Sequence, residues 1–288
     1  MGYLIILLAD LFLAGGFVFQ KIFQQKKGNS LSTGLLFNGI AGLFSAISFV
    51  FISGFKIGAE PYSIVMATAQ TILVTAYTLI SFKILEEGNL SLYTLFLMTG
   101  GMTLPYLYGV LFLDEKLSPL RCVGLIFIIA AVVMSNADIK KTSQKQILLC
   151  VFVFFLNGMV SIVSKIHQIE TVYKTVDSAS FAFWTSAIKL IICVPIYMFV
   201  KKGTESICDL KDIKITGIIL LSALTGGVSY LLQLIGAKDI PATVLYPLVT
   251  GGSIIMCALA GFVVFKEKPT KLQTVGIAVC FAGTCMFI

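Results

Sequence analysis

The sequence predicts an all-α integral membrane protein with ten transmembrane helices, arranged as two inverted five-helix repeats. Hydrophobic residues make up 58% of the 288 residues and charged residues only 12%, whereas soluble domains carry about 25% charged residues. Apolar runs of roughly 20 residues, the length that crosses a ~30 Å hydrocarbon core, follow one another along the chain. The last apolar segment of the first half also recurs at the end of the second half, as expected for a membrane protein built from inverted repeats.

Ten apolar runs are long enough to be spans, and short polar or basic stretches separate them. We place the spans at residues 2–22, 31–54, 62–84, 91–113, 118–136, 147–167, 178–200, 213–236, 241–265 and 270–288. The first run has no basic segment before it and no small-residue cleavage site, so we expect a retained helix and not a signal peptide. The polar intervals reach only about a dozen residues, which is too short for a folded domain outside the membrane.

The duplication is clearest at the end of each half. Residues 114–134 and 266–286 are identical at seven of 21 positions. In each copy a Glu is followed nine positions later by a Gly: Glu115 with Gly124, and Glu267 with Gly276. Two tyrosines of the first half, Tyr77 and Tyr93, also recur at a constant offset of 153 as Tyr230 and Tyr246.

Because five spans is an odd number, two tandem copies enter the membrane in opposite orientations. We therefore expect a first repeat over 1–136, a polar linker over 137–146 and a second repeat over 147–288. The fourth and ninth spans combine a glycine pair with a proline at related positions: Gly100, Gly101 and Pro105; Pro247, Gly251 and Gly252. Helices next to the central site of inverted-repeat membrane proteins are often discontinuous, so we expect these two spans to be interrupted.

The basic residues predict an orientation. The odd-numbered loops contain 14 Lys and Arg and the even-numbered loops six, with Lys165 counted among the six. This bias places the odd loops and the linker in the cytoplasm and both termini outside. The chain has 21 basic and 14 acidic residues, but these charges lie in short loops between spans, so we expect no nucleic-acid partner. The seven cysteines form no CxxC pair, and we expect no metal site and no cofactor.

The two Glu-x8-Gly motifs, together with the five-plus-five duplication, identify a resemblance over essentially the full length. The chain resembles the drug/metabolite transporter superfamily, specifically its ten-helix EamA-like branch. This chain has Asp114-Glu115 and Lys266-Glu267 where the family usually has Gly-Glu. Because we interpret this motif as structural, the departure does not change the functional expectation.

The resemblance implies a secondary active transporter, an exporter or permease, with a central cavity between the two halves. Family members move amino acids, sugars, nucleotide-linked sugars, purines, choline and drugs. We therefore expect a multi-pass protein of the plasma membrane, a monomer or weak dimer in the lipid bilayer, whose partner is a small polar molecule. Transport is expected to work by alternating access and to be coupled to protons or to solute exchange.

Two ionisable residues lie well inside predicted spans. Asp10 is about 13 Å along the first helix at a rise of 1.5 Å per residue, and Lys189 is near the middle of the seventh span. A charge at the bilayer centre costs roughly 2.5 to 3.5 kcal/mol on insertion scales, so such residues usually face a wet interior or a partner. We expect Lys189 to bind an anionic or carbonyl group of the substrate. The alternatives are binding to carbonyls freed near Pro195, or snorkelling towards the interface.

Asp10 is expected to carry the coupling proton or to compensate Lys189. The small four-helix relatives of the family have an acidic coupling residue in their first helix, and Asp10 lies in similar sequence surroundings. The alternatives are a buried, uncharged acid and a carboxylate held near the interface.

Neutral polar residues at mid-span are further candidates for substrate contact. They are Asn38, Gln70, Tyr77, Asn157, Trp184, Tyr230, Gln233, Tyr246 and Thr250. For each one the alternative is a hydrogen bond between helices, worth about 0.6 kcal/mol on average. Trp184, the single tryptophan, is suited either to stacking on a planar substrate or to the membrane interface.

Other classes of function are weighed against these expectations. The single histidine, His167, has no acid at ligand spacing, and the sequence contains no HExxH or GxSxG motif; we therefore expect no enzyme. No GxxxxGK[ST] phosphate loop occurs, which disfavours a primary pump. A flippase for a lipid-linked sugar or another amphiphile, or a helper subunit of one, remains the alternative.

Overall fold

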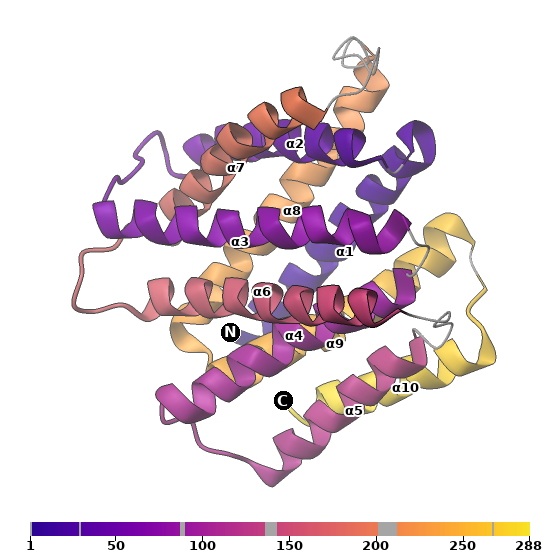
Figure 1. Ribbon diagram of the computed structural model, residues 1–288. Coiled ribbons are helices and arrows are strands. Elements are labelled where there is room, and N and C mark those ends of the chain that lie inside the picture. Colours follow the sequence, from indigo (N-terminus) through magenta and orange to yellow (C-terminus); the bar gives the residue numbers. More distant parts are fainter. Residues whose placement is uncertain (1, 29, 87–89, 136–142, 201–211, 267) are drawn as a thin grey trace.

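The chain folds as a bundle of α-helices. The computed structural model describes residues 2–28, 30–86, 90–135, 143–200, 212–266 and 268–288. These residues form ten helices and no strand: α1 (Gly2–Lys27), α2 (Leu31–Ile52), α3 (Pro61–Glu86), α4 (Leu90–Phe112), α5 (Pro119–Ser135), α6 (Gln144–Ile169), α7 (Ser178–Val200), α8 (Ile213–Asp239), α9 (Ala242–Phe265) and α10 (Lys271–Cys285) (Figure 1).

Each predicted span overlaps one of these helices, and the bounds differ by at most five residues. Eight of the helices, α1–α4 and α6–α9, are long and apolar enough to cross a membrane, while α5 and α10 are shorter apolar helices. The protein is therefore a multi-pass membrane protein. α6 begins at Gln144, three residues before the predicted sixth span, after its N-cap Ser143. Residues 137–142 of the predicted linker lie outside the described residues.

Polar N-caps explain where several helices begin. The side chain of Ser30 accepts a hydrogen bond from the Thr33 N–H at the start of α2. Ser143 and Thr270 form capping boxes at the starts of α6 and α10, each with a Gln three residues later. Such caps satisfy amide groups that have no partner within the helix, and each typically contributes about 1 kcal/mol. At these positions the polar residues between apolar runs define the helix ends.

The two halves of the chain are interleaved. α1 packs against α8, α2 against α7, α4 against α6, and α5 against α10. Figure 1 shows the pair α2 and α7 at the top and the pair α5 and α10 at the lower right. Exchanging α1–α5 for α6–α10 turns the α1–α8 pair into α6–α3 and the α4–α6 pair into α9–α1, and both of those pairs are also in contact.

The expected interruptions of the fourth and ninth spans are wrong. α4 runs unbroken through Pro105, and α9 runs unbroken through Pro247. Neighbouring helices can hold a membrane helix together at a proline, and residues Ala242–Val249 around Pro247 are buried by such neighbours. The glycines instead allow close packing, since a Cβ at Gly100 would overlap the backbone of Phe154 on α6.

The bundle has two distinct ends. The hydroxyl of Tyr3 donates a 3.4 Å hydrogen bond to the carbonyl of Phe287, so both termini lie at one end. This end, which we call the termini end, also contains the loops 53–60, 113–118, 170–177 and 240–241. Two of these loops, 53–60 and 170–177, lie at the left of Figure 1. At the opposite end, the linker end, the ammonium of Lys21 lies 4.4 Å from the centre of the Phe265 ring, which joins the ends of α1 and α9.

Candidate substrate site

A polar centre lies where four helices meet. Gln70 on α3 donates from Nε2 to the hydroxyl of Tyr230 on α8, at 2.7 Å. Ser164 on α6 donates to Oε1 of Gln70, at 3.1 Å. The hydroxyls of Ser164 and Thr185, the latter on α7, also interact with the Tyr230 hydroxyl. Two candidates from the sequence, Gln70 and Tyr230, thus bond to each other directly and also to hydroxyl groups that sequence reasoning did not select.

Tyr246 on α9 extends this centre. Its hydroxyl donates to the backbone carbonyl of Ser161 on α6 at 2.6 Å, and Tyr246 lies close enough to Tyr230 for the two phenols to interact electrostatically. Their counterparts in the first half behave alike, because Tyr77 on α3 interacts with Tyr93 on α4. The spatial pairing of the tyrosines is therefore repeated in both halves of the chain.

Lys189 lies one helical turn beyond Thr185 on α7, so both residues are on one face of the helix. Its side chain lies deep in the bundle, and part of its surface remains accessible. Gly42 of α2 lets this part of α7 approach closely, because an added Cβ would lie 2.9 Å from the carbonyl oxygen of Ser186. Within the described part of the chain Lys189 makes no ion pair and no hydrogen bond. A deep, partly accessible and unpaired ammonium is suited to an anionic or carbonyl group from outside the protein.

Asp10 lies in a different place, on α1 against α9. Its side chain is 2% exposed, and its Oδ1 atom has no hydrogen-bond partner among the described residues. The carboxylate rests against Gly252, where an added Cβ would overlap it, and its charge also acts on Cys257, five residues further along α9. No ion pair or hydrogen bond joins Asp10 to Lys189, so the two residues do not form the compensating pair that the sequence allowed.

The remaining candidates form contacts within the protein. Nδ2 of Asn157 donates to the carbonyl of Leu97 on α4 at 2.8 Å, which joins α6 to α4. Nε1 of Trp184 donates to the carbonyl of Gly58 in the loop before α3 at 2.8 Å. Asn38 and Gln233 bond within their own helices, and Thr250 is half-buried on α9. The structure therefore gathers Gln70, Tyr230 and Tyr246, places Lys189 one helical turn along α7 from Thr185, and leaves the others apart.

The main residue that sequence reasoning missed is Lys165. Lys165 was counted as a loop residue; it lies in α6 and is only 4% exposed. Its ammonium donates to the carbonyls of Ala237 and Ile240 at 2.7 and 2.8 Å, at the end of α8. The expectation that Lys165 lies in a loop failed because its charge is stabilised inside the bundle by carbonyls that have no partner within their helix.

Glu115 accepts hydrogen bonds from the first N–H groups of α9, as Lys165 donates to the last carbonyls of α8. Its Oε1 accepts from the N–H of Ala242 at 2.7 Å, and its Oε2 accepts from the N–H and the hydroxyl of Thr243 at 2.8 and 2.7 Å. Glu115 and Lys165 also attract each other electrostatically. These two side chains hold the turn between α8 and α9, and we call them the α8–α9 clamp. The structural interpretation of Glu115 is consistent with this geometry, whereas Glu267 lies outside the described residues.

A second network lies at the termini end, where it joins α3, α6 and α7. The ring of His167 stacks on Phe181 with 3.8 Å between centroids, and its Nε2 lies 2.8 Å from the hydroxyl of Ser63. In the following loop, Glu170 accepts from the backbone N–H of Val172 at 2.7 Å and from the hydroxyl of Tyr62 at 3.0 Å. The Val172 N–H contributes most to lowering the pKa of Glu170 below its ordinary value of 4.5. His167 is thus a packed structural residue.

This arrangement defines the class of protein. A multi-pass bundle of apolar helices, with a polar centre and a deep cation between its halves, has the architecture of a membrane transporter. The model of the EamA-like transporter family matches residues 144–288, half of the chain. The chain belongs to the EamA-like transporter family, within the drug/metabolite transporter superfamily.

A protein of known structure shares this fold. One protein of known crystal structure has a TM-score of 0.78 to this chain with 12% sequence identity, over 99% of this chain and 95% of that chain. At this identity the similarity shows the fold alone. No curated protein sequence matches the chain.

Proposed function

We propose that this protein is a secondary active transporter of the plasma membrane. It carries a small polar metabolite, without enzymatic change, by alternating access to one central site between two inverted five-helix repeats. All ten helices cross the membrane in this proposal. The observation that carries it is the polar centre of Gln70, Tyr230 and Tyr246, with the unpaired Lys189 one helical turn along α7 from Thr185, in a member of a transporter family.

The interleaved packing supports the inverted repeat. The α1–α8, α4–α6 and α3–α7 contacts have counterparts in α6–α3, α9–α1 and α8–α2 when the two halves are exchanged, and the paired tyrosines recur in the same way. A site on the pseudo-two-fold axis is accessible from each face when the halves rock against each other. In this proposal the α8–α9 clamp and the His167 network are contacts at the termini end that change when the halves move.

The chemistry of the site indicates the substrate. Lys189 offers a positive charge, Tyr230 and Tyr246 offer phenol groups, and Gln70 offers an amide; together they fit a small metabolite with a carboxylate or another anionic group. A buried ammonium that gains such a partner recovers the favourable interactions that it lost on leaving water.

Asp10 is assigned the coupling proton. It is buried, one of its oxygens is unpartnered, and it rests on α9 beside Gly252, with Cys257 as the titratable group that faces it. A charged carboxylate is costly in this position and a neutral one is not, so proton uptake from one side stabilises the packing of α1 on α9. Protonation at this contact therefore links a proton gradient to the movement of the halves.

The experiment is uptake and counterflow in proteoliposomes that contain no ATP. A panel of small anionic and zwitterionic metabolites is first screened by thermal stabilisation of the purified protein, since a ligand at 100 times its Kd adds about 2.7 kcal/mol. A hit is expected to accumulate against its gradient and to exchange across the membrane. Strict ATP dependence, chemical conversion of the solute, or lipid translocation without solute transport would overturn the proposal.

The orientation is proposed from the charge bias, with the linker end in the cytoplasm and both termini outside. Lys145 and Val172 are both exposed and lie at opposite ends of the bundle, which makes them a matched pair for cysteine substitution. A membrane-impermeant thiol reagent is expected to label Val172→Cys from outside, and Lys145→Cys only after permeabilisation. The reverse pattern would overturn the orientation and leave the transport proposal intact.

A further inference from the structure

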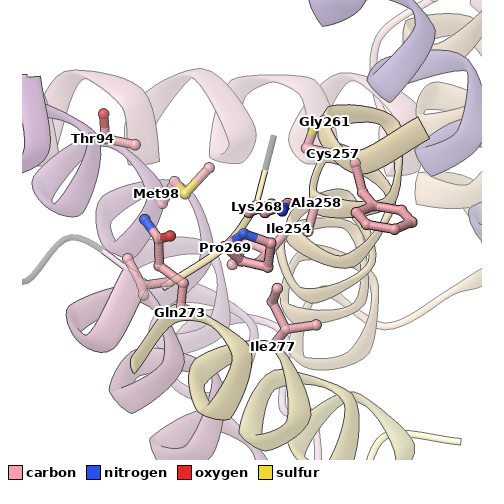
Figure 2. Close-up of a pocket in the computed structure, with 12 residues that line it drawn as sticks. Thr94, Met98, Ile254, Cys257, Ala258, Gly261, Lys268, Pro269, Gln273 and Ile277 are labelled. Atoms are coloured by element: carbon pink, nitrogen blue, oxygen red, sulfur yellow. The ribbon is translucent and has the colours of Figure 1, made fainter. Parts of the chain in front are cut away.

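A cavity separate from the central site lies between α4, α9 and α10. It has a volume of about 580 Å³, within the range of small-molecule sites. Figure 2 shows Thr94 and Met98 of α4 on one side and Ile254, Cys257, Ala258 and Gly261 of α9 on the other, with Lys268 and Pro269 between them and Gln273 and Ile277 of α10 below. None of these residues belongs to the centre of Gln70, Tyr230 and Tyr246.

The lining of the cavity is polar near the start of α10 and largely apolar further along that helix. Its charged residue, Lys268, precedes the start of α10 at the linker end. Gln273, in the first turns of α10, uses its Oε1 to accept from the N–H of Thr270 at 2.9 Å, which leaves its NH₂ group as the donor that faces the cavity. Beyond these two residues the lining is largely apolar, with Met98, Ile254 and Ile277.

The depth of the apolar part matches one leaflet of a bilayer. Ile254 lies eleven residues before Phe265, the last residue of α9, and eleven residues of helix span about 16 Å. Half of the hydrocarbon core is about 15 Å thick. Phe262, another lining residue, is 61% exposed on the outside of the bundle. The cavity therefore opens sideways into the hydrocarbon, with its charged end at the level of the headgroups.

We propose that this cavity binds one anionic phospholipid from the leaflet at the linker end. An acyl chain lies along Met98, Ile254 and Ile277, and the headgroup receives the Lys268 ammonium and the Gln273 amide. A net negative headgroup such as phosphatidylglycerol is favoured over phosphatidylcholine, because the quaternary ammonium of the latter competes with Lys268 for the phosphate. The lipid thus fills the space between α9 and α10, next to the helices of the central site.

The test uses delipidated protein in mild detergent. It examines separately how phospholipid binding depends on charge and on the space in the cavity. Phosphatidylglycerol is expected to raise the melting temperature saturably and to remain bound, one molecule per chain, in native mass spectrometry. Phosphatidylcholine with the same acyl chains is expected to do so at a higher concentration. Lys268→Gln should weaken phosphatidylglycerol binding about fivefold, the factor for one lysine near an anionic lipid. Lys266→Gln, an exposed neighbour that does not line the cavity, should change it less than twofold.

Filling the cavity provides the second arm. Ala258→Trp, and independently Met98→Trp from the α4 side, should abolish retention of the phospholipid while the central site still binds its solute. Equal loss in Lys266→Gln and Lys268→Gln, equal affinity for the two lipids, or full retention in a folded filled-cavity variant would overturn the proposal. If a filled-cavity variant does not fold, the comparison of Lys268→Gln with its control Lys266→Gln still tests whether the phospholipid binds at this cavity.

Discussion

The side-chain amide of Gln70 donates a 2.7 Å hydrogen bond to the hydroxyl of Tyr230, and this bond joins a helix of the first half to a helix of the second. Both groups lie among hydroxyls from α6 and α7. In the proposed transport cycle the two halves move against each other, so this bond has to be compatible with both arrangements or be replaced by contacts to the solute. We therefore expect this pair to link solute binding to movement of the halves.

Tyr230→Phe tests this pair. The change removes the hydroxyl that accepts from Gln70, so we expect solute affinity to fall about tenfold, while stability falls by only ~0.6 kcal/mol, the average for a hydrogen bond between membrane helices. Tyr77→Phe, at the repeat-equivalent position, is the matched control and should change affinity less than twofold. Affinity is measured by ligand-dependent thermal shifts. Equal effects of the two variants would remove Tyr230 from the site.

Replacing Lys189 separates binding from folding. Lys189→Ala should weaken solute binding at least about 30-fold, as expected when one partner of a buried charge pair is lost. Lys189→Met, which keeps the length but removes a mid-span charge costing roughly 2.5 to 3.5 kcal/mol, should be at least as stable as the parent protein. Both quantities come from thermal unfolding with and without solute. A marked destabilisation of Lys189→Met with normal binding would show that the lysine is structural.

Asp10→Asn tests the coupling. The amide keeps the shape of the neutral carboxyl next to Gly252 but cannot release a proton. We expect normal solute exchange in proteoliposomes, with accumulation driven by a pH gradient reduced to the level of empty liposomes. Continued proton-driven accumulation by the variant would assign coupling to another residue, and loss of exchange would indicate that the carboxyl supports the fold.

The α8–α9 clamp should behave as one unit. Glu115→Gln leaves one of the N–H groups of Ala242 and Thr243 without its acceptor, and Lys165→Met leaves the Ala237 and Ile240 carbonyls without their donor. Each change is expected to cost about 1–3 kcal/mol. Because both side chains hold the same turn, the double variant should cost less than the sum, with a coupling of at least 0.5 kcal/mol in a double-mutant cycle.

Asp114→Asn is the control for the clamp, since Asp114 is exposed, lies in the same loop and has a positive φ of 52° that Asn tolerates. It should leave stability nearly unchanged. Additive costs for Glu115 and Lys165 would show that the two residues act independently and that no clamp exists.

The sequence predicted the helices well because apolar length is a strong and local signal. The ten apolar runs coincide with the ten described helices, and polar residues such as Ser143 set the helix starts. The pairing of Gln70 with Tyr230 could not be predicted from the sequence, because it depends on how α3 and α8 are placed in space. The glycine and proline positions gave the wrong expectation that the fourth and ninth spans are interrupted. In the structure α4 and α9 are unbroken, and their glycines allow close packing.

The charged residues show the same limit. Lys189 and Asp10 were found because a charge inside an apolar run is conspicuous. Lys165 was missed because it lies near a helix end, where a lysine normally reaches water; its burial depends on carbonyls about 70 residues later in the chain. Partners distant in sequence therefore decide which of these charges are structural.

The most direct test of the account is whether one residue of the central site is accessible alternately from the two faces of the membrane. Thr185→Cys, in a variant otherwise free of cysteine, places a thiol next to Tyr230. We predict that a membrane-impermeant thiol reagent modifies it from either face of oriented vesicles, and that saturating solute, present on both sides, slows modification from both. Modification from neither face, or from one face only under every condition including an imposed solute or proton gradient, would contradict transport by alternating access.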